Sequence, residues 1–391
     1  MGKIFKNCYF DNAATSWPKP EEVYKAAEEF MRQCGANPGR SGHTRSLGAD
    51  RLVFETRERA ASFLGAAKPE EIVFTLNATD SLNMAIKGIL EPGDHVIYTS
   101  MEHNSVLRPL GSLRQRGVIT TTMVSCDPTG QLDPQDIERA IRPETKLIIC
   151  THASNIIGRI FPVEEIGQLA RKRGILFLLD AAQTAGALSL DLSRIGADLA
   201  AFTGHKSLLG PPGVGLLYLR SGVKIKPWRE GGTGSRSEEE LQPEMMPDYL
   251  EAGTMNTTGI AGLNEGLKYL QKTGMEAVRE HEIKLNRRLI NGLKELRGVR
   301  VYGAGDPEKS VAVTSFTVEG MDSGELGYIL EEDYGILSRT GLHCAPRAHQ
   351  TLGTFPQGTV RFSFSCFTRE EEIDYALGAL QEITSRFSFR D

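Results

Sequence analysis

The sequence predicts an α/β protein that has a large domain with a mixed, mostly parallel sheet and a smaller α+β C-terminal domain. Between residues 72 and 219, short apolar and β-branched segments alternate with helical patterns, which is typical of strands joined by covering helices. Several of these segments are continuously apolar, as expected for strands that are buried on both faces. After about residue 255 the pattern changes to long charged helical segments, which indicates a second domain.

The large domain is expected to begin with helical segments. We predict a helix over residues 20–34, a glycine-rich loop over 35–48 and a second helix over 49–64. The strands that follow share short length and aliphatic or β-branched content, and they are expected at 72–75, 95–99, 119–124, 147–151, 175–180, 199–203 and 214–219. Helical patterns separate most of these strands, for example at 80–90, 134–142 and 163–173.

The second domain is expected to begin with a long charged helical stretch over about residues 258–297. Its other elements are two strands, expected at 311–318 and 359–364, and two helices, expected at 323–332 and 369–387. The N-terminal arm is expected to pack against this domain. We therefore assign residues 16–257 to the large domain, and residues 1–15 and 258–391 to the small one.

The composition is that of a soluble globular protein and argues against several other classes. The 391 residues suffice for two domains, and the hydrophobic and charged fractions are 40% and 24%. A net charge of −5 with dispersed Lys and Arg offers no footprint for nucleic acid or an anionic membrane. No run of about 18 apolar residues and no signal-peptide pattern is present, so we expect a cytoplasmic protein with no membrane span.

The six cysteines are scattered along the chain, at positions 8, 34, 126, 150, 344 and 366. They form no CxxC pair and no spacing typical of metal ligands, so we expect no metal site. In a chain of this length, such a distribution indicates free thiols in a reducing compartment.

A lysine and an aspartate that follow two strand segments indicate the chemistry. Asp180 ends the apolar segment 175–180, and Lys206 follows the segment 199–203 in a turn rich in glycine and proline. A lone lysine is usually a solvated surface residue, but a buried lysine with a lowered pKa is a suitable Schiff-base nucleophile and proton carrier. A buried carboxylate needs a cationic partner, and a protonated pyridine nitrogen can supply it. The pair therefore predicts a pyridoxal 5′-phosphate enzyme.

Two further segments fit such a cofactor and an amino-acid substrate. The segment 77–81 follows the first strand and opens a helix, so its backbone N–H groups and the Thr79 hydroxyl can bind a phosphate. The same residues also read as an ordinary helix N-cap. Arg361 lies inside a strand-like segment, where a charge needs a partner. A substrate carboxylate is one candidate for this partner, and a structural salt bridge is the other.

Matching motifs run from Asp11-Asn12-Ala13-Ala14-Thr15 through Lys206 to the C-terminal domain, and together they resemble the class V aminotransferase family. Within this family, the chain is similar to the cysteine desulfurases and selenocysteine lyases, and the segment around Cys344 is similar to the SufS-type group. The resemblance implies the fold-type I architecture of transferases dependent on pyridoxal phosphate. It also implies a homodimer.

The resemblance assigns five residues to the phosphate and the phenolic oxygen of the cofactor. The phosphate is expected to be bound by Ala78, Thr79, Thr203 and His205. The phenolic oxygen of the ring is expected to lie near Gln183. As a lone amide, Gln183 could equally be structural.

Other residues are expected around the ring, the substrate and the second subunit. By resemblance, His103 stacks on the ring and relays protons, although a lone histidine after a strand is more often structural. Asn155 is expected near the cofactor and the substrate carboxylate, and Ala13 in the substrate site. Gly231 and Thr254 lie in segments that match the family, of which the second reaches the phosphate of the neighbouring subunit. The implication is that two chains build each active site.

Cys344 narrows the choice among reactions. The segment 339–346, Arg-Thr-Gly-Leu-His-Cys-Ala-Pro, resembles the Arg-x-Gly-His-His-Cys-Ala motif of SufS-type desulfurases. Neighbouring His and Arg side chains can stabilise a thiolate, which would attack the sulfur of bound cysteine and become a persulfide while alanine forms. The alternative for a lone cysteine is a small buried apolar residue. Leu342 replaces the first His of the motif, which can alter thiolate stabilisation, substrate preference or acceptor docking.

The function expected from these residues is a cysteine desulfurase that converts L-cysteine to L-alanine and passes sulfur from Cys344 to an acceptor. By resemblance this belongs to sulfur metabolism, with iron–sulfur cluster assembly as its setting. Selenocysteine lyase activity on the same scaffold stays open, because selenolate leaves more easily and need not require the cysteine. Transamination of a small amino acid and a non-catalytic scaffold are further alternatives. The intact Asp180, Lys206 and Arg361 argue against the scaffold.

Overall fold

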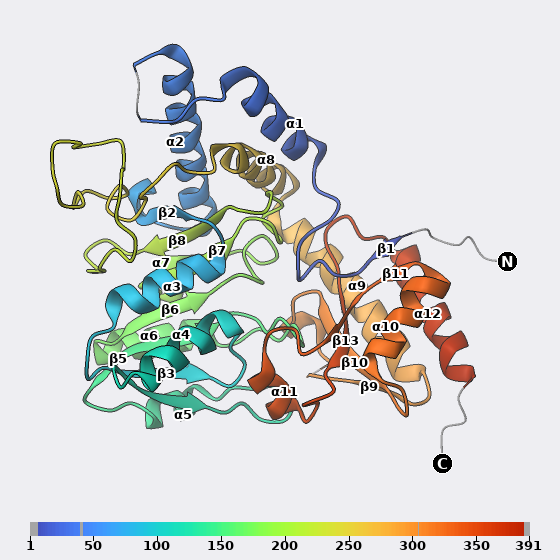
Figure 1. Ribbon diagram of the computed structural model, residues 1–391. Helices are drawn as coiled ribbons and strands as arrows, with labels where there is room; N and C mark the ends of the chain where they lie inside the picture. The colour runs from blue at the N-terminus through green and yellow to red at the C-terminus, as the bar shows by residue number, and fades with distance from the viewer. Residues whose placement is uncertain (1–6, 40–41, 304, 387–391) are drawn as a thin grey trace.

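A seven-stranded sheet forms the centre of the large domain (Figure 1). The computed structural model describes residues 7–39, 42–303 and 305–386. The strand order is β2 (Ile72–Thr75), β8 (Gly215–Leu219), β7 (Leu199–Thr203), β6 (Leu176–Asp180), β5 (Thr145–Thr151), β3 (His95–Thr99) and β4 (Thr120–Val124). β8 is antiparallel to both of its neighbours, and the other pairs are parallel. The predicted mixed, mostly parallel sheet is confirmed, and each predicted strand is present within two residues of its expected bounds.

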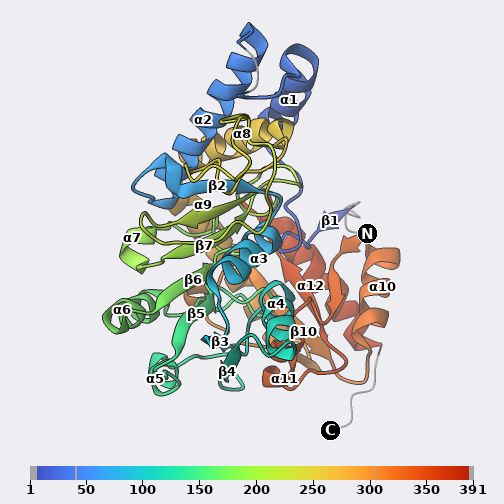
Figure 2. The ribbon, with the colours of Figure 1, turned by 60° about the vertical axis from the view of Figure 1, so that its left-hand side comes forward.

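Helices cover both faces of this sheet, and Figure 2 shows α5, α6 and α7 on the side opposite to α3 and α4. One face is covered by α3 (Ala78–Ile89) and α4 (Asn104–Gln115). The other face is covered by α2 (Thr44–Leu64), α5 (Pro134–Arg139), α6 (Val163–Arg173), α7 (Leu192–Ile195) and α8 (Thr257–Thr273). The helix predicted over 49–64 starts earlier than expected, at Thr44. His43 caps this start by accepting a hydrogen bond from the Ser46 N–H.

The N-terminal helices pack on α8 at one end of the molecule. α1 (Glu21–Glu29) continues into a π-helical turn over Phe30–Cys34, and Gly35 ends it in a left-handed conformation. α1 and α2 both contact α8. In the polar turn 37–43, the family resemblance implies a substrate entrance, although Arg40 and His43 could equally be surface residues; Arg40 lies outside the described residues.

The long helical stretch expected over 258–297 is two helices, so this prediction is wrong in that detail. α8 ends at Thr273, and α9 (Met275–Glu295) starts after Gly274, whose φ of 84° and ψ of 132° break the helical hydrogen-bond pattern. The apolar residues of α8 belong to the core of the large sheet, whereas most of those of α9 belong to the C-terminal core. We propose that the junction between the domains falls near Gly274.

The small domain has a four-stranded antiparallel sheet in the order β12 (Arg339–Gly341), β13 (Thr359–Ser363), β10 (Val313–Val318) and β9 (Val299–Val301). Three helices complete its core: α9, α10 (Ser323–Tyr334) and α12 (Glu370–Ser385). α11 (Pro346–Leu352) lies between the two domains. The N-terminal arm joins this domain as expected, because β1 (Cys8–Tyr9) pairs with β11 (Ile336–Leu337) and Phe10 lies in its core.

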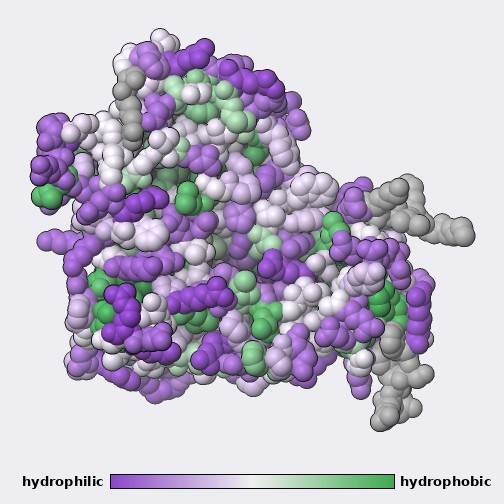
Figure 3. All heavy atoms as spheres, viewed as in Figure 1, coloured by the Kyte–Doolittle hydropathy of each residue, from purple (hydrophilic) through white to green (hydrophobic). Residues whose placement is uncertain are grey.

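The face of the molecule shown in Figure 3 is mostly polar, with apolar patches scattered between charged residues. Among the most exposed large apolar side chains are Leu241, Tyr328 and Met31, with exposed fractions of 83%, 67% and 61%. Within the described ranges, no helix is both long enough and apolar enough to cross a membrane. The same residues contain no group of His, Cys, Asp or Glu that could hold a metal ion.

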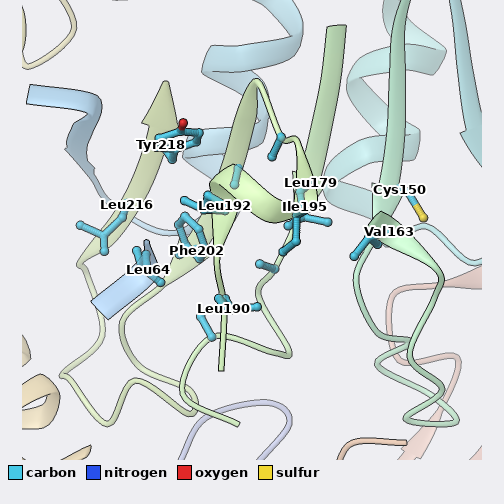
Figure 4. Packing of buried hydrophobic residues seen from close by; sticks show 14 of the residues in the cluster. Leu64, Cys150, Val163, Leu179, Leu190, Leu192, Ile195, Phe202, Leu216 and Tyr218 are labelled. Carbon is cyan, nitrogen blue, oxygen red and sulfur yellow. The ribbon is translucent and has the colours of Figure 1, made fainter. Parts of the chain in front are cut away.

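The core of the large domain follows the alternation of side chains along the strands. Phe177 and Leu179 of β6 point to one face, and Leu178 points to the other. Figure 4 shows the first of these two faces, where Leu64 packs near Phe202 and Leu216. Because both faces are buried, the strands cannot slip by one residue without exposing apolar side chains. The sheet is therefore a rigid platform for the loops at its edge.

Candidate active site

The carboxyl ends of β2, β3, β5, β6 and β7 lie at one edge of the large sheet, because these strands all run in the same direction. Ligands of open α/β sheets bind at this edge. A cavity of about 310 Å³ lies there. Twelve of the predicted site residues line it: Ala13, Ala78, Thr79, His103, Asn155, Asp180, Gln183, Thr203, His205, Lys206, Cys344 and Arg361.

Asp180 is a buried acid that faces the cavity from the end of β6. Its side chain is 4% exposed, and its Oδ1 atom accepts a hydrogen bond of 3.0 Å from the Ala182 N–H. Burial raises the pKa of Asp180, while the Ala182 hydrogen bond and the charge of Lys206 partly oppose this. A cationic group placed against this carboxylate would therefore be strongly favoured. The Gln183 amide, on the next turn, donates to the Ala13 carbonyl at 3.1 Å.

Lys206 lies on a tight turn between β7 and β8. The Leu209 N–H donates to the Lys206 carbonyl, and Leu209 adopts a left-handed φ of 61°, which costs a residue with a side chain about 1 kcal/mol. Burial lowers the pKa of Lys206 to about 8, with Asp180 raising it and Arg361 and Arg339 lowering it. The amine is therefore far more often neutral near pH 8 than an exposed lysine would be.

His103 caps the N-terminus of α4 with its ring. The Nδ1 atom accepts a hydrogen bond from the Ser105 N–H at 3.1 Å and contacts the Ser105 hydroxyl at 2.7 Å. Burial lowers the pKa of His103 to about 4, and the positive charges of Lys206, Arg339, Arg108 and Arg361 add to this. The ring is therefore neutral at pH 7. Because Nδ1 is an acceptor, the proton resides on Nε2.

Cys344 lies in a strained turn at the mouth of the cavity. His343 and Cys344 both have left-handed backbone angles, with φ of 47° and 58°, and Cys344 is exposed. The cost of two such residues in succession is met by hydrogen bonds from the large domain. The Asn155 side chain donates to the His343 carbonyl at 2.8 Å, and the Asn104 N–H donates to the Cys344 carbonyl at 2.8 Å. The backbone of the Cys344 turn is thus held beside the cavity by two hydrogen bonds from the large domain.

Arg361 is the largest fully buried side chain among the described residues and projects from β13. Its Nη2 atom forms an ion pair with Asp11 Oδ1 at 2.6 Å, and Nη1 donates to the Asn155 carbonyl at 3.0 Å. The Nε–H group is buried without a partner. The sequence left two partners open for Arg361, a structural salt bridge and a substrate carboxylate. The salt bridge with Asp11 is present, and the unpaired Nε–H group is a donor that a carboxylate could use.

The opposite end of the cavity is formed by the start of α3. Ala78 and Thr79 occupy its first turn, and the Asn77 side chain caps it by accepting from the Asp80 N–H at 3.0 Å. Gly215 allows β8 to approach this turn, since a Cβ atom there would lie 2.5 Å from Asn77 Cα. The Thr203 hydroxyl is buried without a partner and lines the same cavity. Unpaired donors at a helix N-terminus suit a phosphate group.

The arrangement agrees with comparisons with known proteins. The sequence profile "Aminotransferase class-V" matches residues 8–376, which is nearly the whole chain. The chain belongs to the class-V aminotransferase family. The relatives that it resembles include a "Probable cysteine desulfurase" of Methanothermobacter thermautotrophicus, 37% identical over 96% of this chain and 94% of that protein. Another, of Pyrococcus abyssi, is 36% identical with the same coverage.

Solved structures that this chain resembles include cysteine desulfurases as well. The apo structure of a cysteine desulfurase from Thermococcus onnurineus superposes with a TM-score of 0.92, at 36% identity, over 97% of this chain and 95% of that one. The structure of the Escherichia coli cysteine desulfurase CsdA gives a TM-score of 0.86 at 26% identity, over 97% and 95% of the two chains. The predicted fold class is therefore confirmed.

Two predicted cofactor residues are not brought to this cavity within one chain. Thr254 lines a separate, smaller cavity with Leu76 and Arg229, and Gly231 lines another one. Both lie on the long loop region between β8 and α8, part of which projects beyond the sheet in Figure 1.

The structure adds site residues that sequence reasoning did not assign. Ser105 and Thr151 also line the cavity, and Asp11 pairs with Arg361. Arg339, which the sequence predicted as a neighbour of the Cys344 thiol, lines the cavity as well. Ser105 follows His103 by two residues, so motif proximity was an available signal. Thr151 ends β5 beside Asp180 in the sheet register, which only strand pairing could have shown.

Proposed function

We propose that this chain is a cysteine desulfurase that uses pyridoxal 5′-phosphate to convert L-cysteine to L-alanine and carries the sulfur as a persulfide on Cys344. The observation that supports this most is the presence of a lysine amine, a buried acid, an arginine and an exposed thiol around one cavity. The curated relatives named cysteine desulfurases support the same substrate.

The residues of the cavity fit this cofactor. The buried Asp180 suits a protonated pyridine nitrogen, and the start of α3 with the unpaired Thr203 hydroxyl suits a phosphate. When bound, the cofactor supplies an aldehyde that links to the lysine amine and a ring that accepts electrons released at the substrate Cα atom. Lys206 would hold it covalently, and His103 would lie against it.

The chain's own side chains then divide the work. Arg361 binds the substrate carboxylate through Nε, and this fixes the orientation of the amino acid. Lys206 Nζ, released from its link, takes the proton from the substrate Cα atom, since its amine is readily neutral near pH 8. The proton of His103 is on Nε2, and this N–H group can donate a hydrogen bond.

Cys344 performs the sulfur transfer. Its thiolate attacks the substrate sulfur, so that an S–S bond forms while the substrate Cβ–S bond breaks. The electron pair of the broken bond stays with the three-carbon fragment, which takes up protons and leaves as alanine. The left-handed turn and its two anchoring hydrogen bonds hold the Cys344 backbone in place during this attack. The persulfide then passes to a sulfur acceptor, for which we propose a protein.

The assembly that we propose is a homodimer in which Thr254 and the Gly231 segment of one chain complete the phosphate site of the other. This accounts for the absence of both residues from the cavity of the chain itself. We place the enzyme in the cytoplasm, where Cys344 would stay reduced.

Product analysis tests the function. Purified protein is incubated with L-cysteine, and separately with L-selenocysteine, in the presence of a thiol reductant, and alanine, sulfide or selenide and keto acids are measured. We expect alanine and sulfide from cysteine. Cys344→Ser should lower sulfide release at least about 100-fold, because the nucleophile is gone, whereas Cys34→Ser should not.

The other outcomes separate the rival functions. Alanine formed only from selenocysteine, with activity retained in Cys344→Ser, would indicate a selenocysteine lyase instead. Leu342, which lies beside the Cys344 turn and departs from the desulfurase motif, is the specific feature that keeps this second function in view. Keto-acid production without alanine would indicate transamination.

A further inference from the structure

The carbonyl oxygen of His205 is the centre of an unusual cluster of hydrogen bonds. It accepts from the Ser16 N–H at 3.0 Å, the Thr15 hydroxyl at 3.1 Å, the Ser16 hydroxyl at 3.2 Å and the Lys19 ammonium at 3.1 Å. A carbonyl oxygen has two lone pairs and usually accepts one or two hydrogen bonds. All four donors come from one short segment, residues 15–19, far from His205 in the sequence.

Lys19 is the charged member of this cluster. Its Nζ atom also donates to the Ser16 carbonyl at 3.0 Å and to the Ser16 hydroxyl at 2.9 Å, so that all three of its N–H groups are used. These acceptors are uncharged. The side chain is half-buried, and burial lowers the pKa of Lys19 to about 8. A solvated surface lysine would have neither this burial nor three fixed acceptors.

The His205 carbonyl belongs to the peptide group whose nitrogen is that of Lys206. The turn that follows is tight, because the Gly210 N–H returns to the Gly204 carbonyl and Leu209 is left-handed. Fixing the first peptide of such a turn fixes the direction in which the Lys206 side chain leaves the backbone.

The same N-terminal segment is anchored at its other end in the substrate site. Asp11 pairs with Arg361, and the Ala13 N–H donates to the Ser363 hydroxyl at 2.9 Å. Residues 11–19 thus connect the arginine of the small domain with the lysine turn of the large domain.

We propose that Lys19 is a positioning residue for Lys206, which it orients by holding the carbonyl of the peptide that carries the lysine. This inference rests on the proposed function, since it is the use of the Lys206 amine as cofactor anchor that gives the orientation its purpose. Thr15 and Ser16 share the task, and Lys19 adds a positive charge next to the turn.

Two effects of removing Lys19 act in the same direction. A loosened turn would let the Lys206 amine reach water, and the loss of a nearby positive charge would stabilise its protonated form. Both raise the proton affinity of Lys206. The substitution leaves the other ionisable groups that face this amine in the protein: Asp180, Arg361, Arg339, Asp11, His103 and His205. The charge of Lys19 also helps to lower the pKa of His205, so the variant changes that group in the same direction.

The test measures how fast an acylating reagent modifies Lys206 in the full-length protein, freed of bound small molecules, over a range of pH. Mass spectrometry of the Lys206 peptide gives the rate. The midpoint of the rate–pH profile reports the proton affinity of the amine and is independent of how easily the reagent enters. A melting curve for each variant verifies that it is folded.

Four variants make the test specific. Lys19→Met should raise the midpoint by about 0.5 pH unit or more, and Thr15→Val, which removes one donor but no charge, should raise it less. Lys19→Arg, which keeps the charge, should lie close to the wild type. Lys25→Met, an exposed lysine on α1, should leave the midpoint unchanged.

A midpoint equal to that of the wild type in folded Lys19→Met would overturn the proposal. A lower melting temperature together with this midpoint would mean that Lys19 has only a structural role. An equal shift in Lys25→Met would overturn it as well. Pyridoxal phosphate is then added, and absorbance near roughly 420 nm is followed. If the wild type gains none, the proposed function fails, whereas the midpoints of the apoproteins still decide the role of Lys19.

Discussion

Glu102 is a buried carboxyl group behind the candidate active site. Its Oε1 atom accepts from the Thr99 hydroxyl at 2.6 Å and from the Thr151 N–H at 3.0 Å, while Oε2 has no partner. Burial raises the pKa of Glu102 from about 4.5 to about 8, and the nearby charge of Asp180 adds to this. The side chain is therefore protonated at pH 7 and holds the end of β5 next to Asp180.

This burial predicts a pH-dependent effect of Glu102→Gln on stability. Between the ordinary pKa of 4.5 and the folded-state value of about 8, the unfolded chain ionises Glu102 while the folded chain keeps the proton. The stability of the wild type therefore falls as pH rises through that window. The stability of Glu102→Gln does not fall for this reason, because glutamine does not ionise. The melting temperature of Glu102→Gln minus that of the wild type should increase from about pH 5 to about pH 8.

Thermal unfolding at several pH values measures this difference. The exposed Glu58→Gln on α2 serves as the control and should give a difference that is flat with pH. A flat difference for Glu102→Gln as well would mean that Glu102 is ionised in the folded protein.

Arg361 offers a second test at the scale of one residue. Arg361→Lys keeps a positive charge, but a single ammonium cannot serve Asp11, the Asn155 carbonyl and a substrate carboxylate together. We expect KM for cysteine to rise about 10-fold or more, with a smaller change in kcat, because the lost contact is made to the bound substrate. Steady-state kinetics measures both, and Arg300→Lys, at an exposed position on β9, is the control. A lower kcat with unchanged KM would place Arg361 in the chemical step instead.

Much of the candidate site could be predicted from single residues in their local sequence. Asp180 ends one apolar strand, Lys206 lies in the turn after the next strand, and Cys344 lies in a motif, so strand ends and motif spacing were sufficient signals. The contact of Asn155 with the His343 carbonyl and the pairing of Asp11 with Arg361 could not be predicted. These contacts join residues that are far apart in the sequence, and only the packing of the two domains brings them together.

At the scale of elements, strands were easier to predict than helix boundaries. The strands of the large sheet are continuously apolar and short, which the sequence displays directly. The break at Gly274 was missed because the charged pattern continues across it, although a glycine there was visible. The short strands β9 and β12 and the helix α11 were missed because three to seven residues carry too little periodicity to be recognised.

The link between α2 and the loop region before α8 depends on a buried ion pair. Arg57 of α2 binds Glu251 through two hydrogen bonds of 2.7 and 2.8 Å, and the exposed fractions of their side chains are 6% and 4%. Glu251 also accepts from the Phe74 N–H at 2.6 Å. The pair therefore joins α2, β2 and the segment that carries Thr254.

Replacing Arg57 should be costly. In Arg57→Met, Glu251 stays buried without its cation, and we expect the free energy of unfolding to fall by about 3–5 kcal/mol. Chemical denaturation measures the loss, and Arg51→Met, exposed on the same helix, should change it by less than about 0.5 kcal/mol. A loss as small as that of Arg51→Met would mean that the pair contributes little to holding these elements together.

At the scale of the whole molecule, the proposed homodimer brings two copies of the chain together. The loops that carry Gly231 and Thr254 also expose large apolar side chains such as Trp228, Leu241 and Met245. Apolar surface of this kind is typical of a protein–protein interface.

Mixed dimers test whether active sites are shared. Lys206→Ala should be inactive, and Thr254→Glu should be impaired because its carboxylate would repel the phosphate of the neighbouring chain. If one site uses Lys206 of one chain and Thr254 of the other, co-expression of the two variants leaves one intact site in each mixed dimer. Activity should then recover to about a quarter of the wild-type value, since half of the dimers are mixed. No recovery in verified mixed dimers would mean that both residues act within one chain.

The most direct measurement is to trap the cofactor on the protein. The yellow holoenzyme is treated with borohydride, which makes the lysine link permanent, and its peptides are mapped by mass spectrometry. The account predicts the added pyridoxyl phosphate mass on Lys206 alone, and its loss in Lys206→Ala. The label on another lysine, or on none in a protein that shows the chromophore, would contradict it.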